Sequence, residues 1–205
     1  GPGRPGKQQK PVLRGGACGR QTVFRSDPIV RKGGYDMQKN VASMLNEQVN
    51  KEFYSAYLYL SFANYFVEQG LNGFANWYQV QAQEERDHAM LFVKYLQNND
   101  EPVVYEAISK PDGTWTQSLE VLEAGLAHEK YVTGSIHEIY HAAAEEKDYR
   151  TIQFLDWFVK EQGEEETNAA DLIKKMTLFG SDAKGLYLLD QELATRVYAA
   201  PSLVL

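Results

Sequence analysis

Residues able to bind metal ions recur at one spacing along this chain of 205 residues. Glu52 is followed 33 residues later by Glu85, and His88 stands three residues beyond Glu85. Glu129 is followed 33 residues later by Gln162. Side chains three positions apart share one face of a helix, so Glu85 and His88 would project together. Two facing helical hairpins with this pattern would bring ligands for two metal ions into the core of a bundle.

Four further carboxylates adjoin these positions and point partly away from the central stripe. They are Glu84, Glu161, Glu164 and Glu165. They could hold a third, weaker ion, and a solvated acidic face explains them equally well. Tyr59 lies two turns after Glu52 on the same face. It is a candidate hydrogen-bond or electron donor, and an ordinary core tyrosine is the alternative.

The chain is predicted to position these residues on long amphipathic helices. Helices are expected over 38–68, 72–98, 116–145 and 148–179, with a short apolar one over 183–196. Residues 38–68 contain no Gly or Pro, and their apolar residues recur with a period of 3.6. The connection over 99–115 is too long for a simple hairpin and can run the length of a bundle. The pattern therefore predicts an all-α four-helix bundle with one long crossover connection and a short C-terminal fifth helix.

Four of the candidate ligands interrupt apolar stripes near the midpoints of their helices. They are Glu52, Glu85, Glu129 and Gln162. Burying a lone carboxylate costs several kcal/mol unless a cation or hydrogen bonds compensate. No Lys or Arg shares these stripes, so a set of buried salt bridges would lack counter-ions. Carboxylates with one histidine favour iron or manganese, so the stripes predict a buried site for such ions.

A second metal-binding motif competes with this interpretation. His137, Glu138 and His141 form H-E-x-x-H, the helix signature of zinc proteases. At 100° per residue, His137 and His141 lie about 80° and about 120° around the helix from Glu129. They should therefore point away from the metal-bearing face. His128 also adjoins Glu129 but is rotated off that face. A protease is disfavoured, and incidental surface metal binding is the better reading of the motif.

Charge and composition divide the chain. Residues 1–36 are rich in Gly and Pro and carry eight Lys or Arg but two Asp, a net charge of +6, whereas the remainder carries −13. We expect residues 1–36 to be a flexible basic arm, and we favour an extraneous segment over a functional basic tail. The bundle should occupy 37–180, and the fifth helix and tail 181–205. With Cys18 alone, neither an intrachain disulfide nor a cysteine-based metal site can form, which suits a reducing compartment.

The ordered set of motifs resembles the prokaryotic non-haem ferritins. The resemblance covers about 38–196 and rests on five stretches: Leu45-Asn46-Glu47-Gln48, Glu52-Phe53-Tyr54-Ser55, Gln83-Glu84-Glu85-Arg86-Asp87-His88, Glu161-Gln162-Gly163-Glu164-Glu165 and Gly185-Leu186-Tyr187. His128-Glu129 lies between the third and the fourth. The resemblance implies a ferritin-like bundle and an iron-storage function. Fe(II) would be oxidised by dioxygen or hydrogen peroxide and the ferric mineral stored in a hollow shell, expected to have 24 subunits.

The same resemblance implies roles for individual residues. Glu52, Glu85 and His88 would form the first iron site of a di-iron ferroxidase centre, and Glu85 and Glu129, near Gln162, the second. The four flanking carboxylates would form a third site. The apolar fifth helix would pack about a fourfold axis, which would bury Leu186 to Leu193. Haem is not expected, because Gln162 and Glu165 stand where a haem-containing relative would repeat Glu-x-x-His.

Two other functions remain open from the sequence. One is a non-catalytic cage or scaffold that displays the basic arm, and the other is protection of nucleic acid through the arm. The overall charge of −7 argues against nucleic acid as a partner. No apolar run is long enough to span a membrane, and no secretory signal is evident, so a cytoplasmic location is expected.

Overall fold

Five helices run through the described part of the chain. The computed structural model describes Gly1, Gly3 and residues 35–205, so nearly all of the basic arm lies outside the described residues. Contacts divide the chain into Gly1–Tyr35 and Asp36–Leu205. The second unit contains α1 (Lys39–Glu68), α2 (Asn72–Asn98), α3 (Ser118–Glu145), α4 (Tyr149–Phe179) and α5 (Ala183–Leu193). No strand occurs among the described residues, so the all-α prediction is confirmed.

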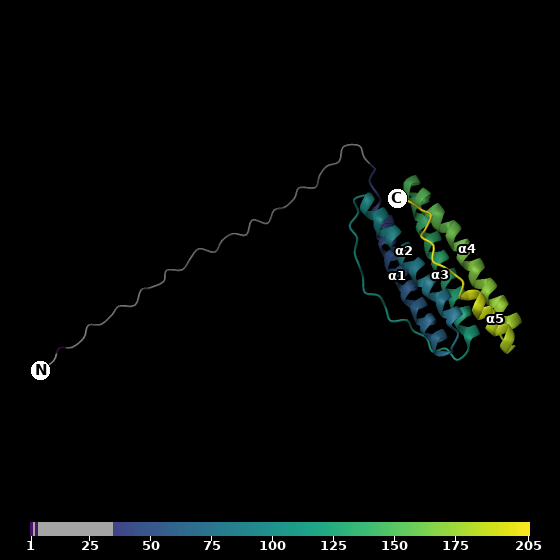
Figure 1. Cartoon of the computed structure of the whole chain (residues 1–205). Helices are drawn as coiled ribbons and strands as arrows, with labels where there is room; N and C mark the ends of the chain where they lie inside the picture. The colour runs from purple at the N-terminus through teal and green to yellow at the C-terminus, as the bar shows by residue number, and fades with distance from the viewer. Residues whose placement is uncertain (2, 4–34) are drawn as a thin grey trace. The chain divides into compact units, whose positions relative to one another are not determined.

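The four long helices form a bundle in which α1 packs against α2 and α3, and α3 against α4 (Figure 1). Their predicted bounds hold to within two residues because local signals set the ends. Asp148 caps α4 by accepting a hydrogen bond from the backbone N–H of Thr151 at 3.0 Å. Gln117 and Glu120 form a reciprocal capping box, which starts α3 at Ser118, two residues later than expected.

The long connection after α2 lies alongside α1 and returns the chain to the opposite end of the bundle (Figure 1). Two asparagines of α1 hold it there. Asn46 Nδ2 donates to the carbonyl of Pro102 at 2.9 Å, and Asn50 Nδ2 donates to that of Ala107 at 3.2 Å. Near the end of the connection, Trp115 packs edge-on against Phe62 with centroids 5.5 Å apart. The predicted crossover is thus confirmed.

Helix α5 is shorter than expected and packs on α2 and α4. It ends at Leu193 rather than 196, since the chain turns at Ala194 and then continues without helix. Asp190 Oδ1 accepts hydrogen bonds from the backbone N–H groups of Gly73 and Phe74, at 2.7 and 3.1 Å, and so caps the start of α2. A side chain at Gly73 would collide with the carbonyl oxygen of Asp190, only 1.7 Å from a Cβ there.

The core of the bundle is rich in aromatic rings. Phe66 stacks on Phe74 at 4.9 Å, and Phe92 lies 4.3 Å from Phe158 by ring centroids.

None of the helices in the described residues is both long and apolar enough to cross a membrane.

Candidate metal centre

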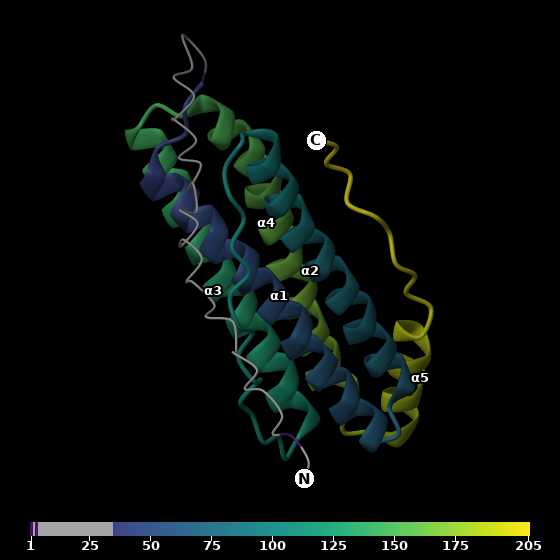
Figure 2. The same cartoon turned by 90° about the vertical axis from the view of Figure 1, so that its left-hand side faces the viewer.

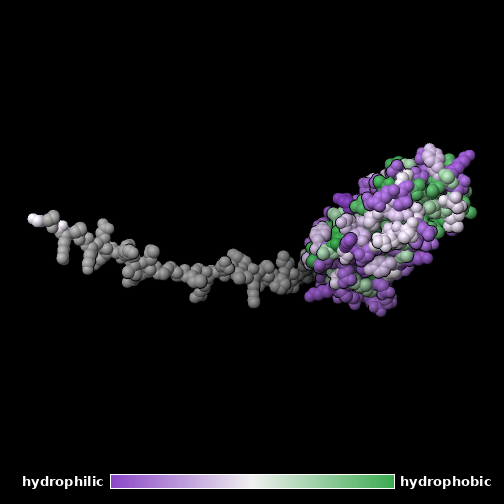
Figure 3. Space-filling view, turned by 90° about the horizontal axis from the view of Figure 1, so that it is seen from below, coloured by the Kyte–Doolittle hydropathy of each residue, from purple (hydrophilic) through white to green (hydrophobic). Residues whose placement is uncertain are grey.

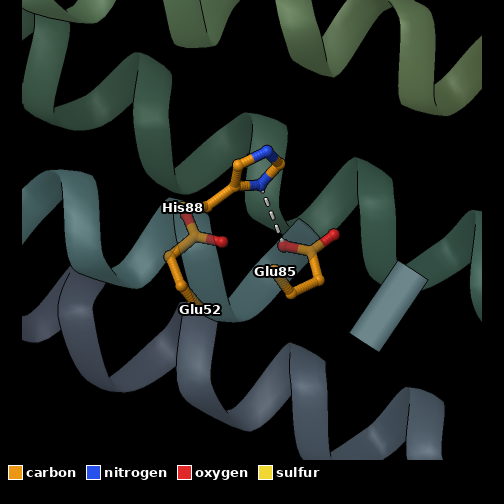
Figure 4. Close-up of side chains that lie close together, drawn as sticks. All are labelled: Glu52, Glu85 and His88. Carbon is orange, nitrogen blue, oxygen red and sulfur yellow. Dashed lines mark hydrogen bonds and ion pairs between the residues drawn. The ribbon is translucent and has the colours of Figure 1, made fainter. Parts of the chain in front are cut away.

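Three predicted ligands converge between α1 and α2 (Figure 4). Glu52 comes from α1, and Glu85 and His88 come from successive turns of α2. One ligand atom from each lies within 4.8 Å of the other two, the only such group of three among the described residues. All three side chains are buried, and His88 Nδ1 lies 3.2 Å from Glu85 Oε2. Atoms at this separation can surround a single cation.

The cluster contains carboxylate oxygens that have no hydrogen-bond partner. Glu52 Oε2 and Glu85 Oε1 are buried and unpaired within the described part of the chain. Burial raises the pKa of Glu52 to about 8, with a further contribution from the charge of Glu85. Burial, followed by the charges of Glu129 and Glu165, raises the pKa of Glu85 well above its ordinary value. Buried oxygen atoms left without donors are what a cation would satisfy.

Glu129 on α3 lies beside this group and is held by hydrogen bonds. The hydroxyl of Tyr59 donates to Oε1 of Glu129, and Gln162 Nε2 donates to Oε2 at 3.1 Å. Burial and the nearby Glu165 raise the pKa of Glu129 to about 8, although the Tyr59 and Gln162 bonds lower it. The twin 33-residue spacing therefore brings residues from all four long helices to one level of the core.

A hydrogen-bonded chain behind Glu52 was not anticipated. Gln48 is fully buried and donates from Nε2 to Glu52 Oε1 at 2.8 Å. Ser135 Oγ donates to Gln48 Oε1 at 2.7 Å, and Lys51 Nζ donates to Ser135 Oγ at 2.6 Å. The series orients the amide so that its N–H faces the carboxylate. Gln48 stands one turn before Glu52 on the same stripe, and this spacing is the feature of the sequence that could have predicted the contact.

Of the four flanking carboxylates, Glu165 is buried most deeply, at 5% exposed. It accepts a hydrogen bond from Gln81 Nε2 at 2.9 Å, while Gln81 Oε1 is buried without a partner. Glu161 is half-buried, and burial raises its pKa. Glu164 is exposed and pairs with Lys160 at 3.5 Å. Glu84 forms an ion pair with Arg196 at 2.6 Å.

The H-E-x-x-H histidines do not converge on the centre. His137 and His141 are exposed, and His141 Nε2 lies 3.5 Å from Glu145. His128 shares a hydrogen bond of 2.8 Å with Ser55, and burial lowers its pKa to about 4. It is therefore neutral near pH 7.

Comparison with known proteins assigns this arrangement to a family. The ferritin-like domain matches residues 42–179, which include every predicted metal ligand. The chain belongs to the ferritin family. A bacterial non-heme ferritin of Campylobacter jejuni is 38% identical over 155 residues, which span 76% of this chain and 93% of that protein. One from Staphylococcus epidermidis is 36% identical, with 79% of this chain and 98% of that protein covered.

Solved ferritins have the same fold. An engineered closed form of the Archaeoglobus fulgidus ferritin superposes with a TM-score of 0.78 at 43% identity and covers 80% of this chain and 100% of that one. An open pore ferritin from the same archaeon superposes with a TM-score of 0.77 at 43% identity and covers 78% of this chain and 98% of that one. The expected ferritin resemblance is confirmed, and this ferritin is an iron-storage protein.

Proposed function

We propose that the buried centre of this ferritin is a ferroxidase site that oxidises Fe(II) before storage. Two Fe(II) ions bind as substrate: one to Glu52, Glu85 and His88, and the other to Glu85 and Glu129 with Gln162 nearby. The main support is the pair of orphaned oxygens, Glu52 Oε2 and Glu85 Oε1, within a buried cluster of three ligands. Carboxylate ligands suit Fe(III) better than Fe(II) and so favour the oxidation.

The electron balance requires both ions. Two Fe(II) ions supply two electrons, which with two protons reduce dioxygen to hydrogen peroxide, or hydrogen peroxide to two water molecules. The raised pKa values of Glu52 and Glu129, each about 8, mean that both carboxyl groups hold protons near pH 7 without metal. Binding of Fe(II) displaces these protons. Tyr59, whose hydroxyl bonds Glu129, positions that carboxylate and is a candidate electron donor.

The four flanking carboxylates are proposed as a third iron site next to the centre. Burial raises the pKa of Glu84 and of Glu161. The charge of Arg196 opposes this rise at Glu84 and that of His88 opposes it at Glu161, while repulsion from Glu165 adds to it at both. A cation among Glu84, Glu161, Glu164 and Glu165 would relieve that repulsion. The third site would receive iron leaving the centre for the ferric mineral.

A shell of 24 subunits is proposed as the container, since ferritins form multimeric iron-handling shells. The end of the bundle near α5 supports an interface. Leu189 and Leu193 are already buried within the subunit. The expectation that a neighbouring subunit buries all of Leu186 to Leu193 is therefore too broad. Tyr187 and Leu188 remain 62% and 56% exposed. A neighbouring subunit would cover these two side chains. Figure 3 shows hydrophobic residues interspersed with hydrophilic ones on the face seen from below.

Single-residue variants test the assignment. Glu85→Ala and His88→Ala should abolish rapid Fe(II) oxidation in stopped-flow absorbance while size-exclusion chromatography shows an unchanged assembly. His141→Ala, which alters an exposed histidine, is the matched control and should retain the wild-type rate. Wild-type rates in both ligand variants would refute the site. A rate in the wild-type protein no higher than in buffer would favour the non-catalytic cage.

A further inference from the structure

The chain after α5 runs back along the bundle beside α2 (Figure 2). We call Thr195–Ser202 the C-terminal strap. The segment lies against side chains of α2 and α4, and three of its residues make polar contacts with them. It therefore lies over the part of the bundle that holds Glu84 and His88.

Arg196 makes the first contact, and it engages Glu84. Arg196 Nη2 lies 2.6 Å from Glu84 Oε2, and both side chains are only 17% exposed. The guanidinium carbon lies 4.1 Å from the ring centroid of Trp77, and Nη1 donates to the Trp77 carbonyl at 3.3 Å. Asn76 Nδ2 donates to the Arg196 carbonyl at 3.0 Å. Both the charge and the backbone of Arg196 are therefore fixed in place.

Two further contacts extend the strap along the bundle. The Tyr198 hydroxyl donates to Asp87 Oδ2 at 2.5 Å, one turn of α2 beyond Glu84. Trp157 Nε1 of α4 donates to Ser202 Oγ at 2.9 Å. The Trp157 ring in turn lies edge-on to His88, with centroids 5.5 Å apart. The strap thus bridges α2 and α4 outside the centre.

An arginine in this position competes with a metal ion. The guanidinium remains charged at any physiological pH, so it offers Glu84 a permanent cation. The pair is mostly shielded from solvent, which strengthens the attraction relative to an exposed pair. Glu84 also lies within electrostatic range of Glu161 and Glu165. A metal ion that binds these acids through Glu84 must first displace Arg196.

We propose that Arg196 is a built-in competitor for the third iron site and that the strap must release Glu84 before an ion can bind there. This inference rests on the proposed function, because it takes Glu84 as a ligand of that site. The strap would keep the third site weaker than the two sites of the centre. Arg196 is then a residue that sets affinity and takes no part in oxidation.

Anaerobic calorimetry with Fe(II) on the assembled protein tests this. In Arg196→Gln, the affinity for the first two Fe(II) ions per chain should be unchanged, and the affinity for the third should rise by about tenfold. The reason is that a neighbouring opposite charge commonly shifts a carboxylate equilibrium by one to three powers of ten. Arg86→Gln is the matched control, since it also removes a positive charge, two residues from Glu84. Arg86 is 63% exposed and pairs with Asp87 at 3.1 Å. This control should leave the affinity for the third ion unchanged.

The outcomes separate the two proposals. If the wild-type protein does not bind two Fe(II) ions tightly per chain, the proposed ferroxidase centre is refuted. If those two ions bind normally, two results would refute the role of Arg196. One is an unchanged affinity for the third Fe(II) ion in Arg196→Gln, and the other is an equal gain in that affinity in Arg86→Gln. In a Glu84→Gln background, Arg196→Gln should have no effect on Fe(II) binding, and a persisting tenfold gain would contradict the proposed contact.

Hydrogen exchange provides a readout that is independent of affinity. In the wild-type protein, the peptide 194–205 should exchange faster once three Fe(II) equivalents are bound than with two. Unchanged protection with the third equivalent bound would show that the strap stays in place, contrary to the proposal.

Discussion

The hydroxyl of Tyr59 on α1 donates a hydrogen bond to Oε1 of Glu129 on α3, 70 residues away in the sequence. Both groups are buried in the core of the bundle. Gln162 of α4 donates to the other oxygen of the same carboxylate. Donors from two helices therefore fix how Glu129 faces Glu85. The charge of Glu129 helps to raise the pKa of Glu85.

Replacing Tyr59 by Phe should slow Fe(II) oxidation by roughly tenfold while Fe(II) still binds, because Glu129 loses one of its two side-chain donors and the candidate electron donor is removed. Stopped-flow absorbance gives the rate, and anaerobic calorimetry gives the binding. Tyr57→Phe is the matched control, since Tyr57 is on the same helix but 50% exposed. An unchanged rate in Tyr59→Phe would show that the hydroxyl has no role in oxidation.

Metal-free protein should lose stability as the pH rises from about 4.5 to about 8. Glu52 and Glu129 ionise near pH 4.5 in the unfolded chain but near pH 8 when folded. Between these values the unfolded chain holds fewer protons, so each group lowers the free energy of unfolding by about 1.4 kcal/mol per pH unit. Urea unfolding in the presence of a chelator at pH 5, 6.5 and 8 measures the slope.

Glu52→Gln should flatten this pH dependence, because an amide cannot ionise. Glu123→Gln, at an exposed position of α3, corrects for the general effect of net charge and should keep the wild-type slope. Equal slopes in both variants would mean that burial of Glu52 does not govern the pH dependence.

Asp190→Ala should lower the free energy of unfolding by about 1–2 kcal/mol, because the first backbone N–H groups of α2 lose their acceptor. Gly73→Ala should destabilise the protein more, since the added methyl group meets the Asp190 carbonyl oxygen and must displace α5. Thermal melting followed by circular dichroism gives both values. Asp182→Ala, which removes the exposed cap of α5, is the control and should cost less. Equal melting temperatures for all three variants would contradict the capping role.

Deletion of residues 1–36 should leave assembly and Fe(II) oxidation unchanged, because every proposed ligand lies on helices α1 to α4, the first of which begins at Lys39. Size-exclusion chromatography and stopped-flow absorbance measure the two properties. Loss of either would assign the arm a structural or catalytic role. A salt-sensitive shift of DNA in a gel, abolished by the deletion, would support the reading in which the arm binds nucleic acid.

The amino-acid pattern alone determined the helices and the long crossover, and it singled out the candidate ligands at the centre. The reason is that helical periodicity and caps are local properties, and a carboxylate on an apolar stripe near a helix midpoint stands out without a structure. Glu52, Glu85, His88 and Glu129 could be chosen in this way because each must face the core on its own helix.

Tertiary structure alone decided the partners of those residues. Nothing local joins Gln48 to Ser135, or Tyr59 to Glu129, since these pairs arise from the way α1 packs against α3. The same holds for the C-terminal strap. The helical pattern ran on to residue 196, but the Arg196 guanidinium lies against Glu84, more than 100 residues earlier in the chain. Contacts between distant segments depend on packing, and periodicity along one segment carries no information about them.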